Sequence, residues 1–217
     1  MSEAELKEFA KQLRKPEGEF GLQVGERMRK GNVHMYAVAL EALHISAGDN
    51  ILEIGMGNGF FVKDILDVHP SIAYSGCDYS ELMVEESVKL NSNFVTSNRA
   101  HFFNTTADKL PFKNESFNKI FTINTLYFWD DYTAVLNEIK RVLKPGGKLV
   151  IAIRPKSLMQ YYPFVKYGFK MFSPEEVTAL LIENNFFVKN TIEKQEPEQD
   201  INGEKVKMST LIIVAEK

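Results

Sequence analysis

A glycine-rich turn between an apolar strand and a helical pattern constrains this chain more than any other feature. The apolar run at residues 51–54 leads directly into Gly55, Gly57 and Gly59. Glycine adopts backbone angles that other residues resist, and it lets the main chain approach a ligand with no side chain between them. The helix that follows would present free backbone N–H groups at its N-terminus. Such a turn predicts a nucleotide-like ligand at the carboxyl end of a parallel sheet, and a tight turn without a ligand is the alternative.

Short apolar runs alternate with helical patterns from residue 50 onward, which indicates an α/β fold. The expected strands are residues 51–54, 72–77, 100–104, 117–123, 148–153, 186–191 and 208–215. The expected helices are residues 60–68, 80–90, 131–143 and 174–184. This alternation predicts a mostly parallel sheet with helices on both faces. Only the polar loop 196–207, with Asn202 and Gly203, separates the last two strands, so they are expected to form an antiparallel hairpin.

The chain before this region carries helical signals that glycines interrupt. Residues 2–14 have apolar positions at helical spacing, and Ser2 and Glu5 have the spacing of a capping box. Four glycines between residues 16 and 31 predict a stretch that is irregular or only briefly helical. Asn32 is a plausible N-cap for a second helix that ends just before the alternating region.

The composition excludes several classes of protein. A formal net charge of -3, from 26 basic and 29 acidic residues, gives no basic surface for a nucleic acid. Cys77 is the one cysteine, so neither a disulfide framework nor a multi-cysteine metal cage is expected, and the histidines lack metal-binding spacing. The N-terminus has no apolar signal segment, and no apolar run approaches the ~18 residues of a membrane span. We therefore expect a cytoplasmic domain that binds no metal.

Two aspartates follow neighbouring strands and are candidate ligand-binding side chains. Asp78 ends the second strand, where an acid can accept hydrogen bonds from both ribose hydroxyls of a nucleoside. Its alternative role is a helix N-cap, although Ser80 already suits that role. Asp108 lies just past the third strand, where a carboxylate could accept a hydrogen bond from an adenine amino group. A turn-forming aspartate before Pro111 is the alternative for Asp108.

The spacing of the glycines separates two classes of nucleotide-binding protein. The dinucleotide fingerprint is G-x-G-x-x-G, whereas this chain has G-x-G-x-G. A GxxxxGK[ST] phosphate loop is absent, which disfavours phosphoryl transfer. A nicotinamide-dependent oxidoreductase is therefore the weaker interpretation.

At this point the sequence resembles a known family, the class I S-adenosylmethionine-dependent methyltransferases, over roughly residues 45–217. The matching segments are the glycine turn at 53–59, Asp78, Ala107 with Asp108, residues 117–130, and the Lys-Pro-Gly-Gly turn within 143–149. The resemblance implies a Rossmann-like three-layer sandwich with a seven-stranded sheet in the order 3-2-1-4-5-7-6, whose last strand is antiparallel. It also implies S-adenosyl-L-methionine as the cofactor. The implied cofactor-binding residues are Glu53, Gly55, Gly57, Asn58, Gly59, Asp78, Tyr79, Met83, Ala107, Asp108, Asn124 and Leu126.

Three residues depart from the pattern of this family. The family often has Cys and Thr where this chain has Met56 and Asn58, in a loop where backbone contacts matter most. It often has Asp where this chain has Asn118, at a position that is usually structural. Neither departure changes the cofactor assignment.

The resemblance implies that a sulfonium already activates the methyl group, so the chain must chiefly align the acceptor and exclude water. A general base is required only when the acceptor arrives protonated and weakly nucleophilic. His34, near the expected lid, and Tyr127, at the end of the fourth strand, are the candidates for that base. The sequence leaves the catalytic residue open.

Three regions are expected to form the acceptor side of the site. Residues 20–36 could fold over the cofactor, with plain packing as the alternative. Asn124, Tyr127 and Trp129 are expected at the carboxyl end of the fourth strand. Residues 154–172 contain six aromatic side chains that could line an apolar acceptor pocket or form a small separate core.

These expectations describe a single methyltransferase domain over residues 1–217. Its parts would be a helical extension or lid at 1–44, a cofactor-binding core at 45–153, a possible acceptor pocket at 154–172, and the last helix and hairpin at 173–217. The expected function is in-line methyl transfer to a small-molecule acceptor, without a nucleic-acid or membrane partner. A non-catalytic S-adenosylmethionine-binding protein, and an RNA or protein target, are the alternatives. The acceptor, its methylated atom and the oligomeric state stay open.

Overall fold

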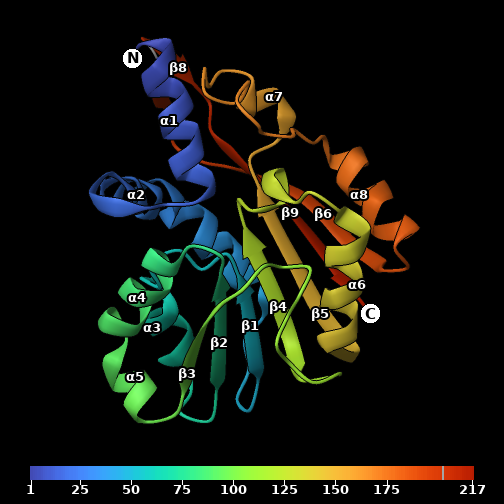
Figure 1. Cartoon of the computed structure of the whole chain (residues 1–217). Coiled ribbons are helices and arrows are strands. Elements are labelled where there is room, and N and C mark those ends of the chain that lie inside the picture. Colours follow the sequence, from blue (N-terminus) through green and yellow to red (C-terminus); the bar gives the residue numbers. More distant parts are fainter. Residues whose placement is uncertain (202) are drawn as a thin grey trace.

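The computed structural model describes residues 1–201 and 203–217, and a seven-stranded sheet forms its centre (Figure 1). The strands of this sheet are β1 (Asn50–Ile54), β2 (Ala73–Asp78), β3 (Ala100–Asn104), β4 (Phe117–Ile123), β5 (Leu143–Ile153), β6 (Phe187–Gln195) and β9 (Ser209–Glu216). Their order is β3-β2-β1-β4-β5-β9-β6. The strands from β3 to β5 pair in parallel, and β9 is antiparallel to both β5 and β6. Because β9 is the seventh strand of this sheet, the predicted order 3-2-1-4-5-7-6 is confirmed.

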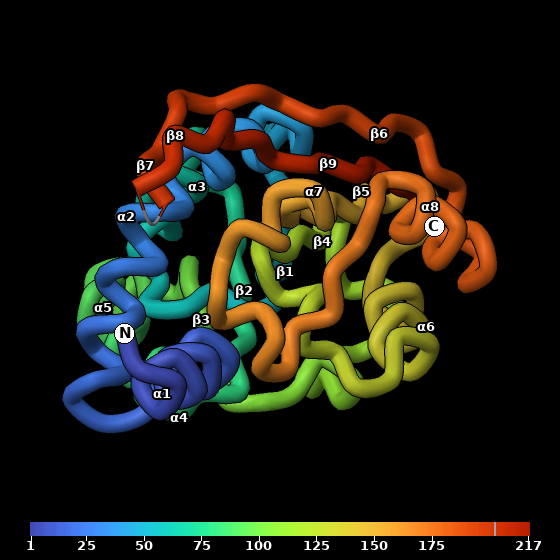
Figure 2. Tube along the Cα trace, turned by 90° about the horizontal axis from the view of Figure 1, so that it is seen from above, coloured from blue at the N-terminus to red at the C-terminus, as the bar shows by residue number. Residues whose placement is uncertain are grey.

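Helices cover both faces of the sheet and complete a Rossmann-like three-layer sandwich. The helices are α1 (Glu3–Arg14), α2 (Gly18–Leu43), α3 (Val62–Leu66), α4 (Glu81–Leu90), α5 (Ser92–Thr96), the 3-10 turn η1 (Leu126–Phe128), α6 (Tyr132–Val142), α7 (Lys156–Met159) and α8 (Pro174–Glu183). The alternation of side chains along β1 separates two cores: Ile51 packs with α2 and α3, whereas Leu52 and Ile54 pack with α6 and α8. Seen from above, β6 and β9 run side by side along one edge (Figure 2).

Capping residues define several helix ends as the sequence predicts. Ser2 and Glu5 form a reciprocal capping box at the start of α1, and Ser173 and Glu176 form another at the start of α8. Each box satisfies two backbone N–H groups that the first turn of the helix leaves without partners. The side chain of Ser80 caps α4.

Helix α2 corrects the prediction for the glycine-containing stretch. The chain is helical without interruption from Gly18 to Leu43, so residues 18–31 are not irregular and Asn32 is not an N-cap. Glycine in a helix costs about 1 kcal/mol relative to alanine, but tertiary contacts require its small size here. A Cβ atom at Gly21 would lie 2.8 Å from the carbonyl carbon of Pro16, and one at Gly25 would lie 3.2 Å from Cε of Met83. These glycines let α2 pass close to the end of α1 and to α4.

Other differences from the sequence prediction are shifted element boundaries and short elements that were not predicted. Helix α3 is shorter than the predicted 60–68, and the short helix α5 was not predicted. The loop predicted at 196–207 contains a small antiparallel pair, β7 (Gln199–Ile201) and β8 (Glu204–Val206). Asn202, which the sequence analysis places in this loop, lies outside the described residues.

The sequence predicts no membrane-spanning segment, and the helices of the structure can be compared with that prediction. Across residues 1–201 and 203–217, no helix is both long enough and apolar enough to cross a lipid bilayer.

Candidate functional site

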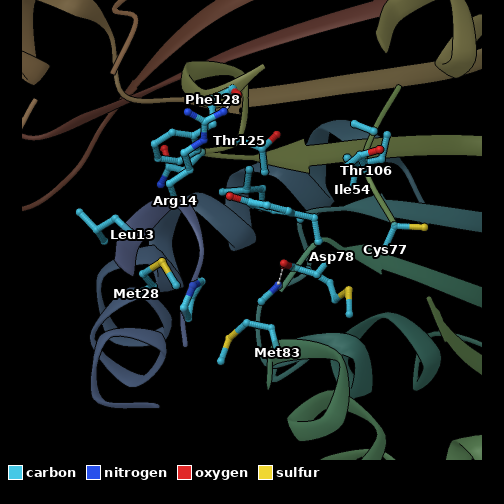
Figure 3. A pocket seen from close by; sticks show the side chains of 18 of the residues that line it. Leu13, Arg14, Met28, Ile54, Cys77, Asp78, Met83, Thr106, Thr125 and Phe128 are labelled. Atoms are coloured by element: carbon cyan, nitrogen blue, oxygen red, sulfur yellow. Dashed lines mark hydrogen bonds between the residues drawn. The ribbon is translucent and has the colours of Figure 1, made fainter. Parts of the chain in front are cut away.

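A cavity of about 340 Å³ opens at the carboxyl ends of β1, β2 and β4, beneath α1 and the first part of α2. Figure 3 shows Leu13, Arg14 and Met28 on one side of this cavity and Asp78 and Met83 below it. Residues from both the roof and the strand ends line it, among them Leu13, Arg14, Met28, Arg29, Asn32, Gly55, Gly57, Asp78, Asn124 and Trp129. The ends of adjacent parallel strands and a helical roof therefore enclose a space suited to a small ligand.

The floor of the cavity is the glycine turn. Gly55, Gly57 and Gly59 have φ angles of 77°, 58° and 67°, in the region that only glycine occupies readily. Gly55 and Gly57 line the cavity, and the neighbouring Asn58 also does. Gly59 instead lies against α4, where an added Cβ would come within 2.8 Å of the Ser87 hydroxyl oxygen.

Helix α4 and its end hold this turn from behind. The Ser87 hydroxyl donates to the carbonyl of Gly57 at 2.9 Å, and Nδ2 of Asn91 donates to the carbonyl of Gly59 at 2.9 Å. Both polar side chains are buried. The turn is therefore fixed in shape, and its front faces the cavity as bare main chain.

Asp78 connects the turn to the end of β2. Its Oδ2 accepts a hydrogen bond from the Gly57 N–H at 3.0 Å, drawn as a dashed line in Figure 3, and its Oδ1 accepts one from the Ser80 N–H at 2.9 Å. Burial raises the pKa of Asp78 to about 6, and the N–H donors oppose that rise. The hydroxyl of Ser80 caps α4, accepting from the N–H of Met83 at 3.3 Å. The N-cap alternative for Asp78 is thus wrong, since Ser80 fills that position.

A second group of sequence candidates lines the cavity beyond Asp78. Tyr79 and Met83 border it from the start of α4, and Ala107 and Asp108 border it from the segment after β3. These four residues line the same cavity as Asp78. The ends of β2 and β3 thus bring together two pairs of residues that are 24 to 29 positions apart in the sequence.

Glu53 lies beneath the turn rather than in the cavity wall. Its side chain is 1% exposed and accepts hydrogen bonds from the phenols of Tyr36 and, at 2.6 Å, Tyr74. Tyr36 itself lines the cavity from α2 and stacks on Phe61 with ring centroids 3.8 Å apart. Burial raises the pKa of Glu53 to about 7, against the lowering effect of the two phenol donors. Glu53 therefore joins the helical roof to the strand that bears the glycine turn.

The raised pKa of Glu53 predicts how stability depends on pH in the protein without ligand. The folded state holds this proton up to about pH 7 and the unfolded state only to about 4.5, so folding binds a proton between these values. We expect this group to contribute about 3 kcal/mol below pH 4.5 that is lost as pH rises through 7. Urea unfolding at pH 5 and 8 measures the difference.

The variant Glu53→Gln should flatten this dependence, because its amide does not titrate. Asp78, with its pKa of about 6, contributes a slope of the same sign that remains in the variant. The exposed Glu41→Gln serves as the matched control and should keep the wild-type slope. If Glu53→Gln shows the wild-type slope as well, the carboxyl does not titrate as described.

Asn124 occupies a left-handed backbone conformation, with φ of 57°, at the carboxyl end of β4. Its side chain lines the cavity and is held on both sides. Nδ2 donates to Oδ1 of Asn32 at 3.0 Å and approaches Sδ of Met35 at 3.1 Å, while Oδ1 accepts from the hydroxyl of Tyr127 at 3.0 Å. The Asn124 amide thus connects the roof helix to the sheet.

Several sequence candidates lie away from the cavity. Leu126 is fully buried and Tyr127 is 3% exposed behind Asn124; burial raises the pKa of the Tyr127 phenol. His34 is exposed on α2 and is not a lining residue. The structure therefore brings neither candidate base to the cavity surface.

Four of the six aromatic side chains in residues 154–172 pack against the core on the α6 and α8 face of the sheet, whereas Tyr161 is exposed. In the described part of the chain, none of the six lines the cavity. Phe164 makes an edge contact with Phe9 at 5.4 Å between centroids, and Phe169 makes one with Phe128 at 4.6 Å. The aromatic residues that line the cavity are instead Tyr36, Phe61, Tyr79, Phe128 and Trp129.

The roof supplies lining residues that the sequence does not predict individually as part of the site. Gly25, Arg29, Asn32 and Tyr36 line the cavity at intervals of three or four residues along α2. Arg14, at the end of α1, donates to both carboxylate oxygens of Asp130 at 2.9 Å. Had the sequence predicted a continuous helix over residues 18–36, the spacing of these residues would have revealed this face. The glycines predicted an interruption instead.

The departures from the family pattern have visible structural roles. Oδ1 of Asn118 accepts a hydrogen bond from the N–H of Asn50 at 3.0 Å, which joins β4 to the start of β1. Met56 is buried, and Oδ1 of Asn58 accepts from the N–H of Phe60 at 3.3 Å. Asn118 therefore stabilises strand pairing far from the cavity floor.

Comparison with known families gives a match over the sheet and the glycine turn. The family profile described as "Methyltransferase domain" matches residues 52–151. The protein MJ1123 of Methanocaldococcus jannaschii, described as uncharacterized, is 34% identical over 71% of this chain and 73% of its own length. The "Uncharacterized methyltransferase YdaC" of Bacillus subtilis is 30% identical over 54% of this chain and 62% of its own length.

A third relative carries a more specific description. The "O-methyltransferase resE" of Aspergillus sclerotiorum is 31% identical over 67% of this chain and 58% of its own length. The chain thus spans about three-fifths of the length of YdaC and resE. Among solved structures, a SAM-dependent methyltransferase from Aquifex aeolicus has a TM-score of 0.69 at 19% identity, covering 96% of this chain and 97% of its own. This likeness extends the shared fold to nearly the whole chain.

Proposed function

Because the chain belongs to the class I S-adenosylmethionine-dependent methyltransferases, we propose that it transfers the methyl group of S-adenosylmethionine to a small-molecule acceptor. One observation carries the proposal. The positive-φ turn at Gly55 and Gly57 and the carboxylate of Asp78 face the same cavity from adjacent strand ends. Bare main chain beside an acid at this spacing suits the amino-acid and ribose parts of that cofactor.

The residues around the cavity fit the parts of the cofactor in strand order. Gly55, Gly57 and Asn58 would contact the methionine part, and Asp78 would accept from the ribose hydroxyls. The adenine would lie among Tyr79, Met83, Ala107 and Asp108, which line the far end of the cavity. We propose that residues 1–44 act as the lid, because α1 and α2 form the roof over these positions.

The chain itself has to position the acceptor and exclude water. Bound S-adenosylmethionine supplies a methyl carbon that the adjacent sulfonium makes electrophilic. Holding an acceptor in line with that carbon can lower the barrier by up to ~7–11 kcal/mol in the best model systems. Tyr36, Arg29 and Met28 of α2 close the cavity from above and limit the access of water.

The outer half of the cavity supports an acceptor with an apolar body. Leu13, Met28, Phe128 and Trp129 provide its surface there. The carboxylates on this side have other partners: Asp130 pairs with Arg14, and the side chain of Asp131 caps α6. Among the described lining residues no histidine faces this side, which supports an acceptor that is nucleophilic without a dedicated base.

Ligand binding and methyl transfer test the proposal together. We expect S-adenosylhomocysteine to bind with a measurable heat and, at 100 times its Kd, to raise the Tm by about 5–10 °C. Incubation with radiolabelled S-adenosylmethionine and a panel of apolar phenols, carboxylic acids and thiols should then label at least one compound. NADH is the control ligand. A shift with NADH and none with millimolar S-adenosylhomocysteine would contradict the proposal, and binding without any transfer would indicate a non-catalytic binding protein.

A further inference from the structure

Asn32 faces the cavity from the middle of α2 and lies outside the segment that matches the methyltransferase profile. It belongs to the lining face formed with Arg29 and Tyr36, one turn to either side. Its position above Asn124 places it over the end of β4, next to the glycine turn on β1. The one role that the sequence predicts for Asn32, a helix N-cap, is wrong because α2 is helical from Gly18 to Leu43.

The hydrogen bonds around Asn124 favour one orientation of the Asn32 amide. The backbone N–H of Arg154 donates to the hydroxyl oxygen of Tyr127, whose own proton can go to Oδ1 of Asn124 at 3.0 Å or to the Arg154 carbonyl at 3.2 Å. With the Tyr127 proton on Oδ1 of Asn124, Nδ2 of Asn124 donates to Oδ1 of Asn32 at 3.0 Å. Turning the Asn124 amide would set its oxygen against the sulfur of Met35, and turning the Asn32 amide would set two NH₂ groups against each other.

This orientation leaves the Nδ2 donors of Asn32 available to a ligand. Within residues 1–201 and 203–217, that nitrogen forms no hydrogen bond to the protein, and the residue borders the cavity. One turn away, the guanidinium of Arg29 lies 4.2 Å from the ring centroid of Phe60 and is paired on one side with Glu26. Amide donors beside a fixed positive charge favour an anionic oxygen.

The strand order indicates which anionic oxygen meets these donors. Asp78 is at the end of β2, the glycine turn follows β1, and Asn124 ends β4, in adjacent positions across the sheet. A nucleoside whose ribose lies at Asp78 therefore extends its amino-acid end toward β4, under Asn32. We propose that Asn32 binds the α-carboxylate of the methionine part of the cofactor, an assignment that rests on the proposed function.

Two ligands that differ only in the amino-acid part provide the test. S-adenosylhomocysteine carries the carboxylate, whereas 5′-methylthioadenosine keeps the adenosine and the sulfur and lacks it. We expect Asn32→Ala to weaken S-adenosylhomocysteine binding about 10- to 100-fold, as for the loss of a hydrogen bond to a charged group. Asn32→Asp should weaken it further, because a second carboxylate repels the first. The affinity for 5′-methylthioadenosine should stay unchanged in Asn32→Ala, measured by calorimetry.

Val33→Ala is the matched control, since Val33 lies on the same helical turn and is 46% exposed. It should bind both ligands as the wild type does. An equal loss of both ligands in Asn32→Ala would show a general structural role and overturn the assignment, and so would unchanged binding of S-adenosylhomocysteine. If the wild type binds 5′-methylthioadenosine and S-adenosylhomocysteine equally well, the amino-acid part has no subsite. If the wild type binds neither, the proposed function itself fails.

Discussion

Asp78→Ala is expected to weaken S-adenosylhomocysteine binding at least 100-fold. Hydrogen bonds to a charged group contribute about 1.5–3 kcal/mol each, and the two ribose hydroxyls would both donate to this carboxylate. The substitution also removes the acceptor for the N–H groups of Gly57 and Ser80, so the glycine turn loses one of its fixed contacts. Calorimetric titration of wild type and variant measures the change.

Two comparisons separate the ribose contact from a general loosening of the turn. Wild-type protein should bind adenosine more tightly than 2′-deoxyadenosine, and Asp78→Ala should lose that preference. Asp67→Ala is the control, because Asp67 forms only an exposed pair with Lys63 on α3. An affinity for S-adenosylhomocysteine within threefold of the wild type would remove Asp78 from the site.

Gly55→Ala is expected to lower the free energy of unfolding by about 2–5 kcal/mol, from backbone strain and overpacking together. The φ angle of 77° lies in the left-handed region, and an added Cβ would lie 2.1 Å from Cγ2 of Thr125. Because Gly55 also lines the cavity, cofactor affinity should fall along with stability. Urea unfolding monitored by circular dichroism gives the difference.

The two contributions can be measured separately. Gly48 has a φ of 82° with nothing within 4 Å of an added Cβ, so Gly48→Ala should show the strain alone. Thr125→Ser removes the clashing methyl group, and adding it to Gly55→Ala should restore part of the lost stability but not all of it. Gly55→Ala with wild-type stability, or a double variant no better than the single one, would contradict this account of the turn.

The sheet and its order could be predicted because their signals are local. Each strand is a short apolar run between turn residues, and the missing helix before β9 indicates the antiparallel hairpin. Asp78 and Asp108 could be placed because the carboxyl ends of neighbouring parallel strands meet at one edge, and both residues do line the cavity. Their role toward the cofactor stays a prediction.

Residues 20–36 were expected over the site, but the unbroken course of α2 could not be predicted, because it depends on contacts between distant residues. Gly21 and Gly25 weaken a helix in isolation, and their fit against Pro16 and Met83 is absent from any local window. Aromatic composition likewise does not distinguish a cavity wall from a core. The sequence therefore did not show whether the aromatic side chains of residues 154–172 line the acceptor pocket. The position of Glu53 could have been predicted from the alternation of side chains along β1. It shares the face of Ile51, under α2, and points away from the face of Leu52 and Ile54.

The unbroken course of α2 has a consequence for how molecules enter and leave. Its second half packs against the sheet, with Met35, Ala39 and Leu43 fully buried. Because the helix is continuous, it has no hinge about which its first half could move separately. We therefore expect ligand exchange to depend on the short α1 rather than on α2. Helix α1 contacts the opposite rim through the exposed pair of Arg14 with Asp130, a hydrogen bond from Arg14 to the Phe128 carbonyl, and the edge contact of Phe9 with Phe164. Each of these contacts contributes about 1 kcal/mol, so opening on that side breaks weak contacts while α2 stays in place.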